Sequence, residues 1–284
     1  MTVGYGAVGA LLEKRSRLAQ PIFDTCRQVH DYHTAMEFLT KPHLSWIEID
    51  VVVALALKRF RKSAEKVRED ALDTSRVEPT LAIVRSGLTG KSLQESESLD
   101  LAVALTKTIQ NAAGMFHQDV LGAVPGWTST GASGGVIDLK GISPVTGRSI
   151  VAESKMRYNT IKASDEAKMW DKLKDAAAVA GGGTLGYLFQ IVPKYTGAYD
   201  RPWVVSGRNP IETVRCADGV TAYHLVTGHP NALFELMDVM PYVTTQVAES
   251  VLGSRENATN TFDHSSMELA RIIQQSFPAK SAHA

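Results

Sequence analysis

The amino-acid sequence predicts an α/β fold, in which helices flank a mixed central sheet and a mainly helical region precedes it. Strand-like segments, some continuously apolar, gather between residues 135 and 193 around one helical segment. Apolar residues at helical spacing dominate the first hundred residues instead. The 284 residues are 44% hydrophobic, which is ample for a buried core. We therefore divide the chain into a mainly helical region, 1–94, and a core, 95–284, that ends in a hairpin and helices.

The N-terminal region is expected to contain several helices separated by prolines. Ser45 is a candidate N-cap, because Glu48 stands three residues later at the capping-box position. Glu78–Pro79 marks a break, and a long helix is expected to start at Glu95. The expected helices cover residues 7–18, 22–38, 45–72, and 95 to 115 or beyond.

The core is expected to combine strands with helices. Leu185 to Val192 is a near-continuous apolar run, typical of a strand buried on both faces. Asp218–Gly219 is a turn dipeptide, and we interpret the apolar segments around it as a hairpin. Pro241 is expected to end or kink a later helix. The expected elements are strands at about 135–141, 149–158 and 184–193, a helix at 164–180 that begins at Ser164, a hairpin of 213–216 and 220–226, and a helix at 230–240.

Three charged side chains on the first two core strands form the candidate reaction site. Side chains alternate along a strand, so Glu153 and Lys155 point to the same side, and a hairpin register can bring Asp138 beside them. Two carboxylates beside an ammonium suit Mg²⁺, which takes one or two carboxylates together with water and phosphate oxygens. The lysine can then stabilise or help to generate the hydroxide that attacks a phosphodiester. The alternative is that Glu153 and Lys155 belong only to the solvated face of a sheet.

Polar side chains that could contact DNA follow this site directly. The run after Lys155 carries the donors that phosphates and base edges require. The alternative is that Asn159 and Thr160 only make a turn and cap the next helix. The expected DNA contacts in this run are Arg157, Asn159, Thr160, Lys162 and Ser164.

Composition and charge argue against several classes of protein. Basic and acidic residues number 30 each, and this zero net charge disfavours a protein that coats DNA by bulk electrostatics. No apolar run reaches the roughly 18 to 20 residues of a transmembrane helix, and the N-terminus lacks an export pattern, so we expect a cytoplasmic protein. The two cysteines and eight histidines match no zinc-ligand spacing. The basic cluster from Lys58 to Arg68 is either a solvated helix face or a contact to the DNA backbone.

The order of these residues resembles a known family. Asp138, then Glu153-x-Lys155 on the next strand, then a helix and a further strand, is similar to the PD-(D/E)xK nuclease fold of type II restriction endonucleases. Ile137 stands in the proline position of that motif, which varies widely in the fold. Three segments also resemble the branch that cuts GGNCC-like sites, and the similarity spans roughly residues 100 to 245. These segments are 111–118, 155–164 and 217–228.

The resemblance implies a Mg²⁺-dependent type II restriction endonuclease that makes sequence-specific double-strand breaks in DNA. Asp138 and Glu153 would hold the Mg²⁺, and Lys155 would position and polarise the attacking water. A third acid is common in this fold on a helix before the core hairpin. The candidates for that acid are Glu48, Glu95 and Glu97. Residues on the earlier helix that share the resemblance, and are expected to line the same cleft, are Lys107, Asn111 and Gln118.

The resemblance also implies partners. Two identical half-sites of a short palindrome favour a C₂ homodimer with one active site for each strand. An enzyme of this kind is paired with a cognate DNA methyltransferase. Two other functions stay open, namely a repair or recombination nuclease of the same fold and a DNA-binding protein that does not cut. The intact set of Asp138, Glu153 and Lys155 argues against the second of these, and the absence of helicase motifs or a basic tail argues against the first.

Overall fold

The core of the protein is a mixed sheet of six strands in the order β1-β2-β3-β4-β6-β5. The computed structural model describes residues 41–72, 79–90, 92–130, 137–252 and 266–278. Neighbouring strands β3 and β4, and β4 and β6, are parallel, while the other pairs are antiparallel. The predicted α/β class is therefore confirmed. The strands are β1 (Trp127–Ser129), β2 (Leu139–Ile142), β3 (Ser149–Arg157), β4 (Leu185–Val192), β5 (Asp200–Pro202) and β6 (Val214–Asp218).

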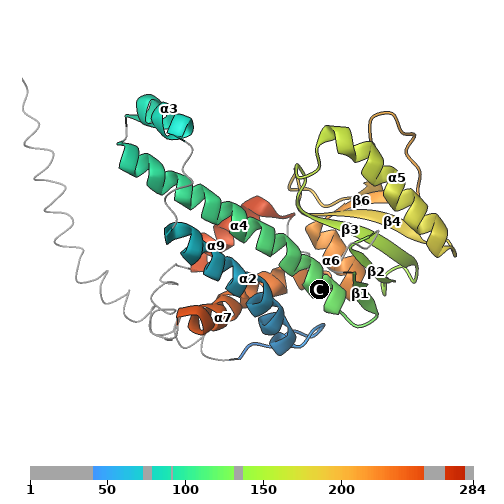
Figure 1. The fold of residues 1–284 in the computed structure, drawn as a ribbon. Helices are drawn as coiled ribbons and strands as arrows, with labels where there is room; N and C mark the ends of the chain where they lie inside the picture. The colour runs from blue at the N-terminus through green and yellow to red at the C-terminus, as the bar shows by residue number, and fades with distance from the viewer. Residues whose placement is uncertain (1–40, 73–78, 91, 131–136, 253–265, 279–284) are drawn as a thin grey trace, which may run out of the picture.

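Helices cover both faces of this sheet (Figure 1). Helix α5 packs on one face against β3, β4 and β6, whereas α4 and α6 contact strands from the other. Behind α4 and α6 lie α2 and α7, which pack against each other. The described helices are α2 (Ile49–Leu72), α3 (Pro79–Thr89), α4 (Leu93–Ala123), α5 (Ala163–Ala180), α6 (Gly219–Thr227), α7 (Ala232–Leu252) and α9 (Ser266–Ser276). None of these described helices is long and apolar enough to cross a membrane.

Strand β4 is buried on both faces, as its apolar run predicts. Tyr187 and Phe189 belong to the larger core cluster, which α4, α6 and α7 complete. Leu188 points the other way and packs with Trp170 and Leu173 of α5. This alternation divides the molecule into a thick helical side and a thinner α5 side. The candidate reaction site lies on the thinner side.

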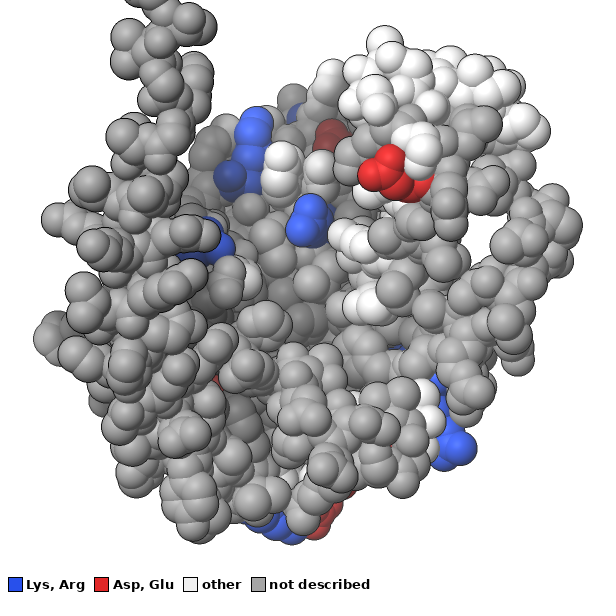
Figure 2. Space-filling model, turned by 90° about the vertical axis from the view of Figure 1, so that its left-hand side faces the viewer, with Lys and Arg blue, Asp and Glu red and all other residues white. Residues whose placement is uncertain are grey.

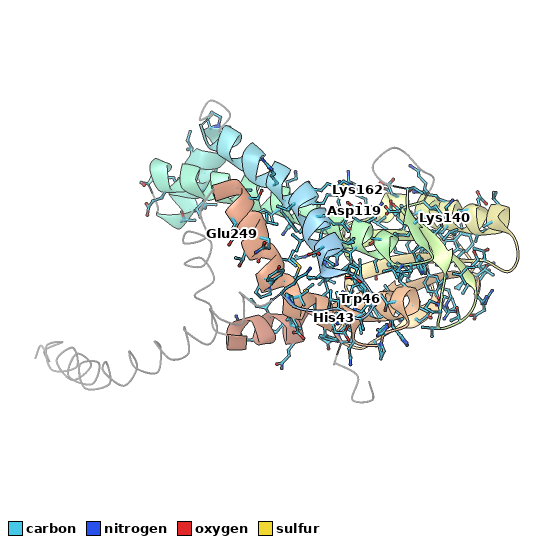
Figure 3. The ribbon with its side chains drawn as sticks, turned by 90° about the horizontal axis from the view of Figure 1, so that it is seen from below. His43, Trp46, Asp119, Lys140, Lys162 and Glu249 are labelled. Carbon is cyan, nitrogen blue, oxygen red and sulfur yellow. The ribbon has the colours of Figure 1, made fainter. Side chains whose placement is uncertain are left out.

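The basic cluster of α2 contributes to helix packing. Asp119 of α4 is buried, and Arg59 donates to both of its oxygens at 2.7 and 2.8 Å. Lys58 donates to the same carboxylate at 3.3 Å. These contacts hold the pKa of Asp119 below its usual value, against the effect of burial. Lys58 and Arg59 thus join α2 to α4, and Figure 3 labels Asp119 between the sheet end and the helical end of the molecule.

The predicted hairpin around Asp218–Gly219 is wrong. Residues 214–218 form strand β6, but the segment after them is helix α6. Asp218 is the N-cap of that helix, and its Oδ1 accepts from the N–H groups of Val220 and Thr221 at 2.9 and 3.1 Å. The apolar run that follows is buried on most sides of the helix, so its composition imitates a buried strand.

Several helix boundaries also differ from expectation. Ser45 does not cap α2, which begins four residues later, and its Oγ lies 3.4 Å from Nδ1 of His229. The capping box belongs instead to Ser92 and Glu95 at the start of α4, a helix that continues to Ala123. Helix α5 begins at Ala163 with Lys162 as N-cap, one residue before the expected start.

Other expectations concern breaks and the N-terminus. Pro241 lies inside α7 and does not end it. Pro79 starts α3, a helix that was not predicted, which agrees with the preference of proline for the first turn. The predicted helices at 7–18 and 22–38 lie outside the described residues. The division at residues 94 and 95 stays a prediction.

Candidate active site

Asp138 lies immediately before β2 and is fixed by backbone hydrogen bonds. Its N–H donates to the carbonyl of Ala152 at 3.0 Å, which extends the β2–β3 pairing by one residue. Its carboxylate Oδ2 accepts from the N–H of Ser154 at 2.9 Å. The carboxylate is thereby held at the middle of β3, beside the side chains of the Glu-Ser-Lys tripeptide.

Glu153 and Lys155 point to the α5 side of the sheet, as their alternation predicts. Lys155 Nζ donates to Glu153 Oε1 at 2.6 Å and lies 4.0 Å from Asp138 Oδ2. The predicted convergence of the three side chains is confirmed. Glu153 is only 5% exposed, so these residues do not form a solvated sheet face.

A second lysine joins the site from α5. Lys172 Nζ donates to Glu153 Oε2 at 2.8 Å, so each oxygen of this buried carboxylate has its own ammonium partner. Lys172 was not predicted from the sequence. It stands 19 residues after Glu153 in another element, and no short motif connects them. Lys172 precedes Leu173, which belongs to the buried stripe of α5. This position next to the sheet-facing side of the helix is the sequence feature that could have predicted its role.

The carboxylates of Asp138 and Glu153 lie close together and are largely removed from water. Burial raises the pKa of Asp138, and the negative charge of Glu153 raises it further. The Ser154 N–H and the two lysines act in the opposite direction. A cation between Asp138 and Glu153 would relieve this repulsion, and two carboxylates suit Mg²⁺. The donor set therefore fits a divalent cation, although within the described ranges no group of three or more His, Cys, Asp or Glu side chains is placed to hold one.

Glu48 and Glu95, the two candidate third acids whose side chains the structure describes, do not join the two carboxylates. Glu95 caps α4, where its Oε2 accepts from the N–H of Ser92 at 2.8 Å. That end of the 31-residue helix lies about 40 Å from the end that meets β1, at ~1.5 Å per residue. Glu97 is in the next turn, and its side chain lies outside the described residues. Glu48 is exposed just before α2, which packs on α4 and α7 and not on the α5 side.

The expected DNA contacts after β3 form an exposed segment that leads from the reaction site to α5. Arg157, Asn159, Lys162 and Ser164 are all exposed. Thr160 is exposed too, but its Oγ1 donates to the Arg157 carbonyl at 2.8 Å, so this residue makes the turn. Lys162, the N-cap of α5, makes no side-chain capping bond. In the view of Figure 3 its label lies beside that of Asp119, away from Glu249 among the helices.

The three expected contacts on α4 separate into two kinds. Lys107 and Asn111 are exposed. Gln118 is 7% exposed, and its Nε2 donates to Ser129 Oγ of β1 at 3.3 Å. The free protein therefore does not present Gln118 to a ligand. Its side chain joins α4 to the edge of the sheet.

Charges of both signs lie among each other on one face of the molecule. On the face drawn in Figure 2 the described Lys and Arg side chains form separate patches, with Asp and Glu side chains among them. This pattern agrees with the zero net charge of the chain. Binding of a polyanion would therefore depend on local cations.

Two comparisons with known proteins identify the family of the chain. The family model described as Eco47II restriction endonuclease matches residues 37–249, which include the sheet and all three predicted site residues. The chain is also 33% identical over 175 residues to the type II restriction enzyme Eco47II of Escherichia coli. That alignment covers 58% of this chain and 70% of the enzyme. The chain therefore belongs to the Eco47II restriction endonuclease family and is a site-specific endonuclease.

Proposed function

We propose that the protein is a Mg²⁺-dependent type II restriction endonuclease that makes double-strand breaks at a short palindrome. The observation that carries this proposal is the convergence of Asp138, Glu153 and Lys155 on the α5 side of β3. A GGNCC-like recognition sequence is supported by the resemblance of three segments to the branch that cuts such sites. A protein that only binds DNA would not need two buried or half-buried carboxylates beside two lysines.

Asp138 and Glu153 would hold Mg²⁺ against the scissile phosphate. When bound there, the ion supplies Lewis-acid polarisation of the phosphodiester and lowers the pKa of a water. Lys155 Nζ, 2.6 Å from Glu153, is fixed where it can donate to the attacking water and to the phosphate oxygens. Lys172 holds the second oxygen of Glu153 and so fixes the orientation of the carboxylate. The exposed segment 157–164 would bind the backbone and base edges of the same duplex.

The proposal extends to partners. A palindromic target favours a C₂ homodimer, in which each protomer cuts one strand. A cell that holds such an enzyme in its cytoplasm must protect its own sites, which supports pairing with a cognate DNA methyltransferase. The exposed apolar side chains of α3 and α4 support the dimer.

The catalytic assignment is tested with Asp138→Ala and Glu153→Ala. Each variant should lose cleavage of phage DNA in MgCl₂ but keep binding in gel-shift assays, because losing a carboxylate also removes repulsion from phosphate. Asp175→Ala, an exposed acid of α5, is the matched control and should cut normally. Discrete fragments whose sequenced ends share a motif support site-specific cutting. Near-normal cleavage by Asp138→Ala would show that the assignment is wrong.

A further inference from the structure

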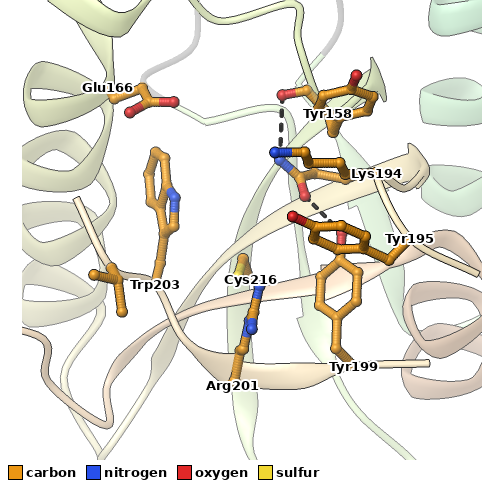
Figure 4. Close-up of a pocket in the computed structure, with 10 residues that line it drawn as sticks. Tyr158, Glu166, Lys194, Tyr195, Tyr199, Arg201, Trp203 and Cys216 are labelled. Carbon is orange, nitrogen blue, oxygen red and sulfur yellow. Dashed lines mark hydrogen bonds between the residues drawn. The ribbon is translucent and has the colours of Figure 1, made fainter. Parts of the chain in front are cut away.

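A pocket opens on the α5 side of the sheet, beyond the reaction site (Figure 4). Its volume is about 420 Å³, within the size range of small-ligand sites. Four aromatic side chains are among the ten residues that line it. They are Tyr158, Tyr195, Tyr199 and Trp203. Trp203 lies on one side of the hollow and the Tyr195 and Tyr199 rings lie on the other, so the pocket has the form of a slot.

Polar groups are placed around this slot. Gln190 lies between the tyrosines, with Oε1 accepting from Tyr199 OH at 2.6 Å and Nε2 donating to the Tyr158 carbonyl at 3.5 Å. Its amide is therefore held in one orientation. Glu166 of α5 lies at the rim above Trp203. Burial raises the pKa of the Cys216 thiol, which lies next to the Arg201 side chain.

Two basic side chains lie over the tyrosine rings of the pocket. The Arg201 guanidinium lies 5.3 Å from the Tyr199 ring centroid, and Lys194 Nζ lies 5.2 Å from that of Tyr195. Both basic residues are exposed. Aromatic side chains for stacking, with cations close to them for phosphates, are the two features that single nucleotides require of a protein.

The pocket is adjacent to the catalytic strand. Gln190 of β4 is the Cα partner of Lys155 of β3, and both side chains point to the α5 side. Adjacent strands lie about 4.8 Å apart, so the near wall of the pocket begins one strand from the catalytic lysine. A duplex held at Lys155 therefore brings its neighbouring nucleotides to the mouth of the slot.

We propose that the pocket binds one nucleobase that is rotated out of the duplex next to the scissile phosphate. The base stacks between Trp203 and the Tyr195–Tyr199 side, Gln190 and Glu166 form hydrogen bonds with its edge, and Lys194 and Arg201 bind the flanking phosphates. This assignment rests on the proposed function. An intact base pair has both faces covered by its neighbours and could not enter a slot with aromatic side chains on both sides, which selects an extrahelical base.

The test uses wild-type protein without divalent cations and duplexes that carry the mapped cleavage site. In one series each base pair in turn has one base replaced by an abasic nucleotide. Removing the partner of the rotated base removes pairing energy that binding must overcome, so affinity should rise roughly ten-fold or more at that one position. In a second series 5-iodocytosine or 5-iodouracil replaces each pyrimidine, and an 8-bromopurine replaces each purine, so that the photoreactive base is always the one tested for rotation. Irradiation should link the same position to Tyr195, Tyr199 or Trp203, as identified by peptide mapping.

Two tryptophan variants provide the matched pair. Val204 lines the pocket and is 72% exposed, so Val204→Trp should fill the slot without disturbing the core. Val179 is 89% exposed on α5 outside the pocket, and Val179→Trp adds the same side chain elsewhere. Val204→Trp should lose both the abasic effect and the cross-link, whereas Val179→Trp should keep both.

Cleavage of unmodified DNA by the same preparation separates this inference from the proposed function. A protein that cuts at a fixed sequence, but shows no abasic effect or no cross-link to the pocket, overturns the pocket assignment alone. Equal behaviour of the two tryptophan variants also overturns it. A protein that cuts at no fixed sequence overturns the proposed function, and the pocket assignment is rejected with it.

Discussion

Glu153 carries two ammonium partners that come from different elements. Its side chain is 6% exposed, and a carboxylate so far from water is stable only when it is paired. Lys155 reaches it along the same strand, and Lys172 reaches it from α5. The two lysines hold the carboxylate from both sides. Each therefore contributes to its orientation as well as to its charge balance.

We predict that Lys172→Met slows cleavage by roughly 10- to 100-fold, the equivalent of one hydrogen bond to a charged group. Lys172→Arg should recover part of the rate, because it restores a cation near Oε2. The measurement is single-turnover cleavage together with DNA affinity in the absence of metal. Affinity is expected to change little, since Lys172 acts through Glu153.

Lys168→Met is the control, one turn earlier on α5. Its side chain is 82% exposed and pairs only with Asp165 at 3.4 Å, an i,i+3 surface pair of small energetic value. It should cut at the wild-type rate. A Lys172→Met enzyme that also cut at that rate would show that Lys155 alone is enough to hold Glu153.

Some site residues could be predicted from the sequence and others could not, for a physical reason. Asp138, Glu153 and Lys155 lie within one hairpin, so strand alternation and a short turn determine their proximity. Lys172 reaches Glu153, and Tyr158 and Trp203 come to line one pocket, only after α5 and the distant strands pack on the sheet. Tertiary packing of this kind leaves no short spacing in the sequence. The DNA role of the segment 157–164 stays a prediction.

The position of helix α5 depends on one glycine of strand β4. A Cβ at Gly186 would lie 2.7 Å from the carbonyl oxygen of Leu173, which is backbone and cannot rotate away. The absence of a side chain at this point lets α5 approach the sheet closely. Lys172 precedes Leu173, so the same contact places its ammonium at Glu153.

We therefore predict that Gly186→Ala moves α5 outward and affects both stability and cleavage. Overpacking of this kind costs about 1–3 kcal/mol in the free energy of unfolding, which urea denaturation would measure. The cleavage rate should fall under conditions in which the variant is fully folded, because Lys172 is displaced.

Gly197→Ala is the matched control, since a Cβ there meets nothing within 4 Å. It should be neutral in both measurements. If Gly186→Ala were less stable but cut at the normal rate, the distance between α5 and the sheet would not affect how Lys172 orients Glu153.

Most elements of the sheet were predictable because their patterns are local. The β4 run and the turn before β3 gave the correct strands. The segment after Asp218 was not predictable in the same way, because an apolar run fits both a buried strand and a buried helix. Capping by Asp218 decides between them, and a Cβ at Gly219 would lie 2.3 Å from the Ile191 carbonyl oxygen, so a glycine is needed for packing there and not for a turn.

Helix α3 and the first half of α4 project away from the sheet (Figure 1). The two helices pack against each other, yet they expose several large apolar side chains. Soluble monomers rarely expose large contiguous apolar surfaces, and such surfaces indicate association. The exposed residues are Ile83, Val84, Leu88, Leu99, Val103 and Ile109, with exposed fractions of 62%, 50%, 83%, 37%, 61% and 45%. We propose this set, the arm surface, as the contact between two copies, because a palindrome requires two reaction sites related by a two-fold axis.

We predict that the wild-type protein is a dimer in light scattering and that Leu88→Glu combined with Val103→Glu converts it to a monomer. Two buried carboxylates facing their symmetry copies in a C₂ interface would be costly. The monomer keeps Asp138, Glu153 and Lys155 intact, so it should still nick one strand of supercoiled DNA, while linear double-strand products fall by at least roughly ten-fold.

Val179→Glu, at a residue that is 89% exposed on α5, introduces the same charge away from the arm surface and should stay dimeric. Wild-type protein that is monomeric both free and on its cognate duplex would remove the dimer. A dimer that survives the double substitution would instead place the interface on another surface of the chain.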